Sequence, residues 1–529
     1  MSRVAIIGGG IGGLAAAALL ARDGHDVVLL EQQPTFGGRA GSWDQDGFRF
    51  DTGPSWYLMP EVFDHFYKLL GTNADEQLDL VQLDPGYRVY AEGEAVPFDV
   101  AADVAETLDA FERIEPGSSR KLVPYLDRAK EIYDLAKERF LYSTFAKLGP
   151  VFRGEVLAKG PRLVRLLLEP LDKLVNRTVR DIRLRQVLGY PAVFLGSAPA
   201  LAPSMYSLMS HLDLVDGVFY PVGGFTRVID SIERLARAEG AHLRAGVAVR
   251  RIVVVDGTAT GVEVVAADGS TEVIEADLVV SAADLHHTET RLLEDAASRS
   301  YPEEYWQKAV AGPSALLILL GVQGELPKLE HHTLFFAAAW AENFQAIFGD
   351  VPRIPETPSF YVCKPSGVDP SVAPEGTENL FVLVPLPADP GIGRGGVGGA
   401  GDELVEALAD TVIARIAEWA DIPDLATRVV LRRTVGPADF EADLNAWKGT
   451  ALGPAHILRQ SAFFRPGNQS KKVRGLYYVG SSTIPGIGLP MCLISAEILV
   501  KRLRGDTTAG PMPEPLVPTV ATFTGRSLG

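Results

Sequence analysis

The N-terminal residues alternate short apolar runs with a glycine-rich turn. Arg3–Ile7 and Val27–Leu30 are apolar runs that predict strands, and the alanine-rich stretch Leu14–Arg22 predicts a helix between them. A run of small residues at positions 8–13 joins the first strand to the helix without a gap, and Glu31 follows the second strand. The predicted order is therefore strand, glycine turn, helix, strand and acid.

Helical and strand patterns continue in blocks along the rest of the chain. Residues 95–215 are mostly helical, and the apolar run Ala276–Ala283 predicts a buried strand that returns to the N-terminal sheet. The expected helices are Ala101–Ile114, Lys121–Arg139, Pro161–Leu174, Thr226–Glu239, Asp402–Ala420 and Met491–Leu503. The expected strands include Ala248–Val255, Gly261–Ala266, Ser314–Val322, Glu378–Pro385, Thr427–Arg432 and Leu476–Gly480.

The glycine turn carries the dinucleotide-binding fingerprint G-x-G-x-x-G in its full context, with Gly8, Gly10 and Gly13 at the glycine positions. Gly8 permits the tight turn, Gly10 has no Cβ, so a pyrophosphate can approach the backbone, and Gly13 lets the helix pack close to the strand. The pyrophosphate would then lie at the N-terminus of the helix, near Gly12, where free N–H groups favour an anion. Glu31 can accept hydrogen bonds from both ribose hydroxyls, and its charge would repel a 2′-phosphate. The alternative is a chance glycine turn, which would not need the second strand and the acid.

Composition removes several classes of function. The chain has 529 residues, enough for two or three domains, and its net charge of −17 argues against nucleic acid as a partner. The only cysteines, Cys363 and Cys492, argue against a disulfide framework and favour a reducing compartment. The histidines show no metal-ligand spacing, and the pairs His286-His287 and His331-His332 are interpreted as loop or capping residues, so no metal is predicted. No apolar run is long enough to span a bilayer, and no signal peptide precedes the first strand.

Residues 391–396 also fit G-x-G-x-x-G, which could indicate a second nucleotide site. Pro387 and Pro390 interrupt the approach to this segment, the next helix begins only at Asp402, and no acid closes the following strand. We therefore expect a flexible loop here and a single bound dinucleotide.

A second strand–turn–helix unit lies near the C-terminus. The strand Leu476–Gly480 enters a turn that contains Gly480, Gly486 and Gly488, and Leu489 precedes the helix Met491–Leu503. Glycines let this backbone approach a flat ring, and the dipole of the helix would stabilise a reduced, anionic flavin. The alternative is an ordinary turn onto a C-terminal helix.

The residues after Glu31 distinguish between cofactors. Gly37-Gly38-Arg39 resembles the Gly-Gly-Arg segment of the flavoprotein group that includes amine oxidases and carotenoid desaturases. In that group the arginine approaches the phosphates of the flavin nucleotide, a task that suits its planar fork. The alternative is a surface-loop arginine.

Four segments together resemble the bacterial-type phytoene desaturases, and residues 51–71 are similar to the actinobacterial members. The segments are Gly37-Gly38-Arg39, Asp51–Ser55, Tyr220–Gly224 and the closing turn from Gly480 to Gly486. The resemblance implies non-covalent FAD, a C40 polyene (phytoene) as substrate, and a quinone or oxygen as electron acceptor. It also implies that Val249 meets the adenine through its backbone. Ser481 stands where many flavoproteins carry an acid that holds the ribityl chain, and the desaturases resemble this chain in lacking that acid.

The expected fold class is α/β: a Rossmann-type FAD-binding domain with an amine-oxidase-like substrate domain and a helical membrane-facing segment. The FAD-binding domain would comprise residues 1–90, 216–300 and 441–505. Residues 91–215 would form the helical segment, and residues 301–440 the sheet of the substrate domain. The Pro-, Thr- and Gly-rich tail 506–529 predicts disorder.

Residues 139–185 combine eleven basic side chains with four acidic ones and many apolar ones. Basic and apolar residues on short helices are typical of a membrane-surface segment, although a solvated basic helix pair over an ordinary core has the same composition. A C40 hydrocarbon resides in the bilayer, so the resemblance favours docking on the inner, cytoplasmic face of the cell membrane.

The implied chemistry is stepwise removal of hydrogens, with hydride passing to the flavin and a proton to a base, towards lycopene or a partly desaturated intermediate. Asp51 is a weak candidate for the base; a structural turn carboxylate is its alternative role. A C30 polyene is an alternative substrate. The alternative functions are another carotenoid or apocarotenoid desaturase, an isomerase or carotenoid-binding protein, and a flavin amine oxidase.

Overall fold

The computed structural model describes residues 1–147, 149, 160–266 and 269–518. Arg153 and Lys159 of the basic segment, and residues 519–529 of the expected disordered tail, lie outside the described residues.

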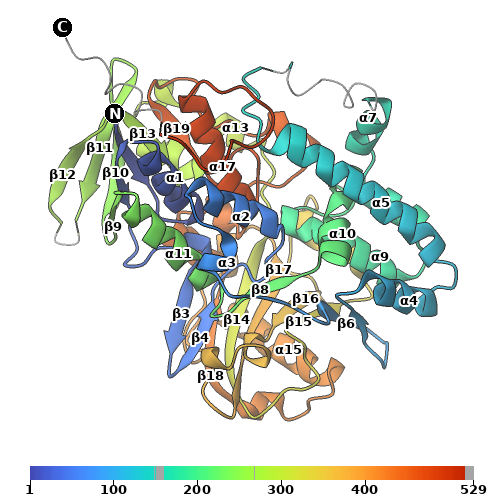
Figure 1. Cartoon of the computed structure of the whole chain (residues 1–529). Helices are drawn as coiled ribbons and strands as arrows, with labels where there is room; N and C mark the ends of the chain where they lie inside the picture. The colour runs from blue at the N-terminus through green and yellow to red at the C-terminus, as the bar shows by residue number, and fades with distance from the viewer. Residues whose placement is uncertain (148, 150–159, 267–268, 519–529) are drawn as a thin grey trace, which may run out of the picture.

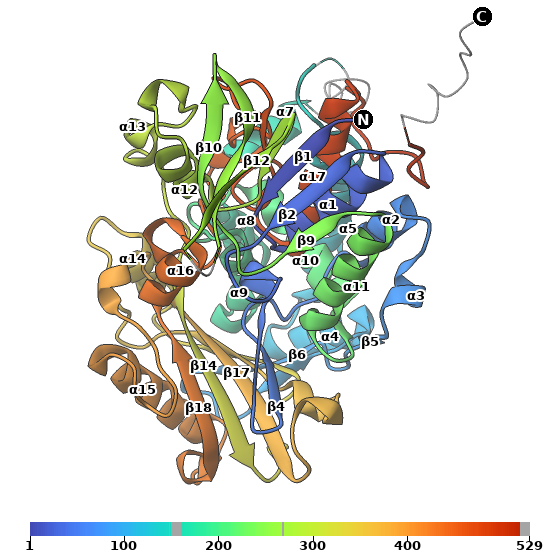
Figure 2. The ribbon, with the colours of Figure 1, turned by 90° about the vertical axis from the view of Figure 1, so that its left-hand side faces the viewer.

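A five-stranded parallel sheet holds the N-terminal strand at its centre (Figures 1 and 2). The order is β19-β13-β1-β2-β9, and every neighbouring pair is parallel. These strands are β1 (Arg3–Ile7), β2 (Asp26–Leu30), β9 (His242–Arg244), β13 (Leu278–Ser281) and β19 (Leu476–Tyr478). Strands from three distant parts of the sequence therefore assemble one sheet, and their carboxyl ends lie at the same edge, where such sheets bind ligands.

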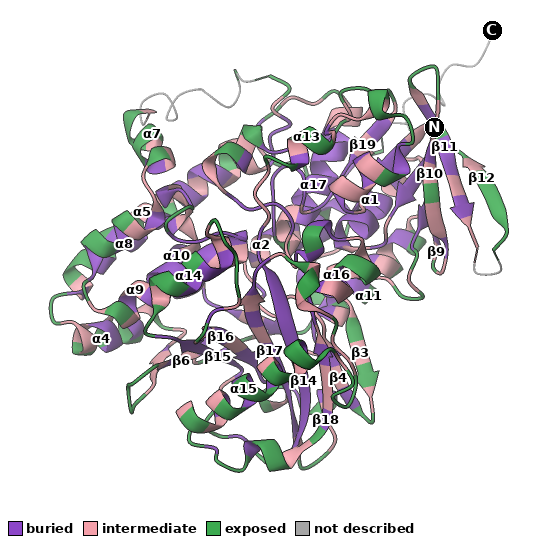
Figure 3. Ribbon diagram, turned by 180° about the vertical axis from the view of Figure 1, so that it is seen from behind, coloured by how far each residue is buried: buried purple, intermediate pink, exposed green. Residues whose placement is uncertain are grey.

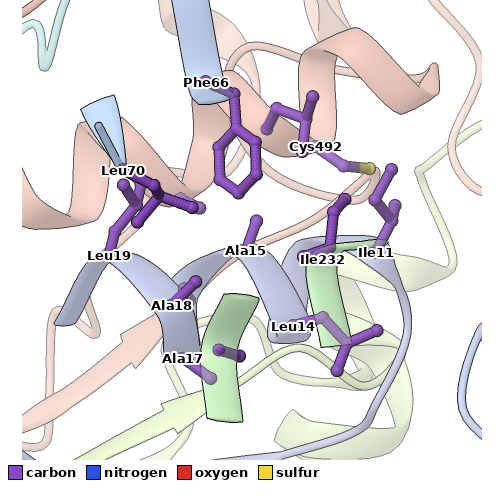
Figure 4. Close-up of a cluster of buried hydrophobic side chains, with 14 of the residues drawn as sticks. Ile11, Leu14, Ala15, Ala17, Ala18, Leu19, Phe66, Leu70, Ile232 and Cys492 are labelled. Carbon is purple, nitrogen blue, oxygen red and sulfur yellow. The ribbon is translucent and has the colours of Figure 1, made fainter. Parts of the chain in front are cut away.

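Helices cover one face of this sheet. Helix α1 (Ile11–Arg22) packs against α11 (Phe225–Ala238) and α17 (Leu489–Leu503), and α2 (Pro60–Leu69) packs on α17. Successive β1 side chains point to opposite faces, so Val4 and Ile6 join the core under α1. The four consecutive alanines at residues 15–18 are fully buried because neighbours press on α1 from several sides, as Figure 4 shows.

A three-stranded antiparallel sheet covers the other face (Figure 2). It consists of β10 (Ala248–Val255), β11 (Thr258–Val265) and β12 (Thr271–Glu275). Ala5 and Ile7, the alternate residues of β1, pack in the cluster that contains Val262 and Val264 of β11.

The second large sheet has seven strands in the order β18-β14-β17-β16-β15-β6-β7. Its strands are β6 (Tyr87–Ala91), β7 (Phe98–Val100), β14 (Ser314–Gln323), β15 (His332–Phe336), β16 (Phe360–Cys363), β17 (Thr377–Leu386) and β18 (Val429–Val435). Only the β15–β6 pair is parallel. Strands β6 and β7 come from residues 87–100, a contribution that the sequence does not predict, because strand pairing over this distance has no local signal.

Strand β14 is apolar along nearly its whole length because both its faces are covered. Leu316, Ile318 and Leu320 pack under α15 (Glu403–Trp419), whereas Leu317 and Leu319 pack against β4 (Phe48–Asp51), the partner of β3 (Ser42–Gln45). A short pair, β5 (Leu80–Gln82) with β8 (Phe219–Pro221), connects this region to α11.

Helices between residues 104 and 211 form one side of the molecule (Figures 1 and 3). They are α4 (Val104–Ile114), α5 (Ser119–Ala136), α7 (Gly160–Leu168), α8 (Leu171–Thr178), α9 (Ile182–Gly189) and α10 (Met209–His211). The predicted single helix Pro161–Leu174 is wrong: Pro170 separates α7 from α8, because proline disfavours the helical conformation of the residue before it. The remaining short helices are α3 (Ala74–Gln77), α12 (Leu285–His287), α13 (Glu303–Trp306), α14 (Trp340–Phe348) and α16 (Pro437–Leu444).

No helix among the described residues is both long enough and apolar enough to cross a membrane.

The predicted disorder after Gly505 is wrong for residues 506–518, which lie against α2 and α17. Leu516 is 2% exposed, and its N–H donates to the Leu69 carbonyl at 2.9 Å. The buried ammonium of Lys501 donates to the carbonyls of Tyr142, Thr508 and Gly510. Specific contacts therefore outweigh the composition of this segment.

The glycine-rich segment at residues 391–396 is a loop, as expected, but neighbouring elements hold it. Gly395 N donates to Asp439 at 2.7 Å and Gly396 N donates to Thr434 at 2.9 Å. No residue of this segment lines the cavity described below.

Candidate functional site

In the turn between β1 and α1, an added Cβ would meet open space at Gly10 but would clash at Gly13. A Cβ on Gly13 would lie 2.0 Å from the Gly8 carbonyl oxygen, so only glycine permits this packing of helix on strand. A Cβ on Gly10 would meet nothing closer than the Gly37 oxygen at 3.8 Å. The space in front of Gly10 is where a pyrophosphate would approach the backbone.

Glu31 lies at the end of β2, at the carboxyl edge of the sheet. Its carboxylate accepts hydrogen bonds from Gly9 N at 2.6 Å and Gln33 N at 2.8 Å, and its side chain also lines the cavity. The two backbone donors fix the orientation of the carboxylate, which retains lone pairs for ribose hydroxyls.

The Gly37-Gly38-Arg39 segment lies directly against the fingerprint turn. Gly37 N donates to the Gly9 carbonyl at 2.9 Å, and Gly37 and Gly38 have φ angles of +124° and +56°. The Arg39 guanidinium is 3.9 Å from Asp284, and its buried Nε has no hydrogen-bond partner. Nη2 of Arg39 donates to the Thr450 carbonyl at 3.5 Å, whereas the unpartnered Nε, beside the open helix N-terminus, fits the phosphates of a dinucleotide.

Val247 and Val249 bring the start of β10 to the same cavity. Val247 N donates to the Glu31 carbonyl at 2.8 Å, which ties this strand to the acid. The β10–β11 register shifts between Val249 and Arg251. Val249 and Glu31 therefore line the same cavity, and the adenine contact of Val249 stays a prediction.

The C-terminal turn meets the N-terminal turn. A Cβ on Gly12 would lie 3.2 Å from the Gly480 Cα, so the two glycines bring both turns together. Gly480, Gly486 and Gly488 have φ angles of +105°, +147° and +117°. Gly488 precedes the first residue of α17, Leu489, so the N-terminus of this helix faces the cavity.

Two buried residues that sequence reasoning missed hold this closing turn. Arg465 is 3% exposed and donates to the carbonyls of Ser481 and Thr483, and also to those of Pro454 and Gln460. His456 accepts a hydrogen bond from Ile487 N through Nε2 at 3.2 Å and is bonded through Nδ1 to the Tyr206 hydroxyl. Both are single polar residues in irregular segments, so no local pattern marks them.

Asp51 does not line the cavity. Its carboxylate accepts from Phe225 N at 2.7 Å and from the backbone and hydroxyl of Thr226, at the N-terminus of α11. Burial raises the pKa of Asp51 to about 6 even though these hydrogen bonds oppose the shift. This geometry gives Asp51 the structural role and does not support its assignment as the base.

One cavity of about 610 Å³ connects the nucleotide turns to an apolar region. Gly8, Gly10, Gly12, Glu31, Gly38, Arg39, Val249, Gly480, Gly488 and Leu489 all line it, whereas Gly13 and Gly486 support the backbone behind it. One group of apolar lining residues comes from α5, the turn that follows it and α7: Ile132, Phe140, Phe145, Leu163 and Leu167. A second group comes from β15 and α14: Leu334, Phe336, Trp340, Phe344 and Ile347.

Carboxylates of the described cavity wall are confined to the nucleotide end. They are Glu31, Asp284 near Arg39, and Asp443, whose carbonyl accepts from Gln32. The apolar region therefore suits an uncharged, extended ligand.

Known proteins resemble the chain over nearly its whole length. The carotenoid 3,4-desaturase of Haloarcula japonica is 40% identical over 504 residues, which are 95% of this chain and 98% of that protein. The zeta-carotene-forming phytoene desaturase of Myxococcus xanthus is 34% identical, over 95% of this chain and 93% of that protein. An oxidoreductase from Methanosarcina mazei has a similar fold, with a TM-score of 0.63 and 18% identity over 94% of this chain and all of that one.

Residues 11–503 match the family described as flavin containing amine oxidoreductases. The match begins inside the first glycine turn, at Ile11, and spans Arg39, the large sheet and the C-terminal turn. The chain belongs to the flavin containing amine oxidoreductase family, and its cofactor is FAD.

Proposed function

We propose that this protein is an FAD-dependent carotenoid desaturase that removes hydrogens stepwise from phytoene or a related C40 or C30 polyene. The observation that carries the proposal is a single cavity that joins the nucleotide turns to a long apolar region, whose described wall carries no carboxylate. The names of the Haloarcula japonica and Myxococcus xanthus relatives support the same substrate class.

The residues of the site suit FAD. Arg39 and the N–H groups at the start of α1 would hold the pyrophosphate, Glu31 the ribose, and Val249 the adenine. The turn from Gly480 to Leu489 would lie along the flavin ring. When bound, FAD supplies the acceptor for a hydride from an allylic carbon of the polyene.

The protein's own part is to orient the substrate and exclude water. A polyene offers no charged group, so the shape of the wall between Phe140 and Phe344 has to select the carbon that faces the ring. Arg465 and His456 keep the closing turn fixed while the substrate shifts for each step. The extended wall favours successive desaturation towards lycopene.

The test incubates purified holoenzyme with phytoene in liposomes and a quinone, and records visible spectra and product masses. We expect new long-wavelength bands and losses of two hydrogens per step, and parallel runs with oxygen alone identify the electron acceptor. Flavin reduction by a diamine with no change in the polyene would favour an amine oxidase instead. A polyene product of unchanged mass would indicate an isomerase.

We also propose that the mouth of the cavity docks on an anionic membrane surface, on the cytoplasmic side. Helix α7 lies at the periphery of the molecule (Figure 3), and Leu163 and Leu167 line the cavity while Val164 and Leu168 are 54% and 67% exposed. Phe463 also lines the cavity, and its neighbour Phe464 is 55% exposed. Exposed apolar side chains on the same helix as exposed basic ones, Arg162 and Arg165, suit a headgroup boundary.

Vesicle sedimentation tests the docking proposal. With phosphatidylglycerol vesicles, we expect Val164→Asp with Leu168→Asp to lose at least tenfold in binding, because each charge opposes burial of that face. The matched control is Val430→Asp. Val430 is 60% exposed and lies on β18 of the seven-stranded sheet. Equal loss in the control would contradict docking through α7.

A further inference from the structure

Three side chains with metal-binding atoms meet where β15 begins and β16 ends. Cys363, the last residue of β16, pairs with His332, the first residue of β15, and His331 precedes it. One donor atom from each residue, an imidazole nitrogen or the thiol sulfur, lies within 4.8 Å of the other two. The interpretation as a loop or capping residue is therefore wrong for His332, which lies in β15 and pairs with Cys363, whereas His331 lies in the bend before the strand.

These residues are buried, and their ring nitrogens lack partners. His331, His332 and Cys363 are 5%, 0% and 2% exposed. Neither ring nitrogen of His331 has a hydrogen-bond partner, and neither has Nε2 of His332, whose Nδ1 is bonded to the Tyr361 hydroxyl at 2.6 Å. A neutral imidazole carries one N–H donor and one acceptor nitrogen, so a buried ring with neither satisfied requires an explanation, such as an ion.

Rings and strands hold the cluster in place. Trp56 stacks on His332 with ring centroids 4.5 Å apart, and the ring centroids of Tyr220 and His331 are also 4.5 Å apart. The Tyr361 hydroxyl that bonds His332 is also bonded to the Ser55 hydroxyl at 2.7 Å. An outer hydrogen bond of this kind orients a histidine whose other nitrogen binds a metal.

Charge narrows the choice of ion. The neighbouring acids are engaged elsewhere: Asp51 caps α11, Asp369 accepts from Gly223 N, and Glu378 lies 3.6 Å from the Lys364 ammonium. The cluster therefore offers one thiol, which binds a metal as the thiolate after it loses its proton, and two neutral imidazoles. A monovalent ion would make this buried unit neutral, whereas a divalent ion would leave a net charge next to a lysine.

We propose that His331, His332 and Cys363 form a three-coordinate site for a monovalent copper ion, separate from the FAD site. Thiolate and imidazole are ligands that copper(I) accepts. With metal–ligand bonds of about 2.0–2.3 Å, the donor atoms of a trigonal site lie roughly 3.7 Å apart. Side-chain rotations that shorten the donor–donor distances by about 1 Å would therefore form the site. Binding would release the thiol proton and join β15 to β16 without any change of oxidation state.

The experiment measures copper in the holoenzyme. Protein is purified from copper-supplemented cells, and is also given copper(I) without oxygen in competition with a coloured copper(I) chelator. We expect one copper per chain that resists the chelator, less than a tenth of that in Cys363→Ser, and full retention in Cys492→Ser. Cys492 is the matched control because it is also a buried free cysteine but lies against Gly12.

Wild-type protein without copper at equilibrium with the chelator would overturn the proposal, as would equal loss in the Cys492 variant. Stoichiometric zinc in place of copper would overturn the choice of a monovalent ion. If Cys363→Ser does not fold, as judged by flavin content and circular dichroism, X-ray absorption of the wild-type protein decides. One sulfur and two imidazole ligands support the site, and a sulfur-free spectrum overturns it.

Discussion

The backbone N–H of Ile487 donates to Nε2 of the buried His456, and this bond joins the closing turn to the segment that precedes Arg465. A Cβ on Gly486 would lie 2.3 Å from the same imidazole ring. The closing turn, which lines the cavity, therefore packs directly on His456, with no side chain between them.

His456→Ala should loosen the closing turn. We expect kcat to fall about tenfold. The unfolding midpoint should change little more than in other variants that lose one side chain. His456→Gln should recover part of the rate, because its amide oxygen can accept a hydrogen bond from Ile487 N. Burial holds the pKa of His456 well below its usual range, so the imidazole stays neutral. The pH profile of kcat between pH 6 and 9 should therefore keep its shape in His456→Gln; a shifted profile would give His456 a role in proton transfer.

Two glycines of the first turn should separate folding from cofactor binding. Gly10→Ala places a methyl group in the open space and should leave the apoprotein stable, but weaken FAD binding at least tenfold by blocking the pyrophosphate. Gly13→Ala places the same methyl group 2.0 Å from a carbonyl oxygen and should prevent folding. Circular dichroism of both variants and flavin titration of the Gly10→Ala apoprotein measure the contrast. Normal FAD affinity in a folded Gly10→Ala would show that the cofactor lies elsewhere.

Arg39→Ala should weaken FAD binding by about 10- to 100-fold, the range for loss of a hydrogen bond to a charged group. The unpartnered Nε marks Arg39 as a donor to the phosphates. Arg39→Lys should recover less than half of the lost free energy, because an ammonium lacks the planar fork. Fluorescence quenching of added FAD gives the dissociation constants. If wild type, Arg39→Ala and Arg39→Lys bind FAD equally well, Arg39 does not bind the phosphates, and its contacts are those with Asp284 and Thr450.

The ordered tail should contribute to stability in a pH-dependent way. Burial alone would lower the pKa of His65, but its hydrogen bonds to Glu497 and Glu514 raise it overall. A raised pKa stabilises the fold fully below the unfolded value of about 6.5, and this contribution disappears as the pH rises through the folded value. Raising the pH from 6 to 9 should therefore lower the unfolding midpoint of wild type more than that of Glu514→Gln.

Truncation after Gly505 provides the companion measurement. It removes two of the three acceptors of Lys501 and the buried side chains of Met512 and Leu516. We expect the free energy of unfolding to fall by about 3–5 kcal/mol, since each apolar side chain contributes about 1.5–3 kcal/mol. An unchanged stability would mean that the tail does not pack in solution.

Local patterns predict the N-terminal unit well, because each of its elements is specified by adjacent residues. The strand Arg3–Ile7 is confirmed as β1, and Ala248–Val255 as β10. Long-range features are not predictable in this way. Strand β6 joins the large sheet through parallel pairing with β15, which is more than two hundred residues away. Nothing in the sequence around Tyr87, where β6 begins, indicates that partner.

The residues of the candidate site differ in the same way: some are predictable from the local sequence and others are not. Glycines and Glu31 are predictable because a phosphate-binding turn requires them at set spacings. Arg465 and His456 act through carbonyl and N–H groups of a turn that is distant in sequence, so their roles appear only once the chain is folded. The proposed metal site depends on the cross-strand pair His332–Cys363, so it too has no local sequence signal.

Asp51 should matter for stability and not for turnover. Asp51→Ala leaves the N–H groups of Phe225 and Thr226 without their cap, which should cost about 1–2 kcal/mol. Because burial raises the pKa of Asp51 to about 6, above the unfolded value near 4, its ionisation opposes folding. Wild-type stability should therefore fall as the pH rises from 4 to 6 by more than that of Asp51→Asn, which cannot ionise. Urea unfolding at several pH values measures this difference. Turnover of FAD-saturated Asp51→Asn should stay within about twofold of wild type; a hundredfold loss in a folded, flavin-loaded variant would restore Asp51 as the base.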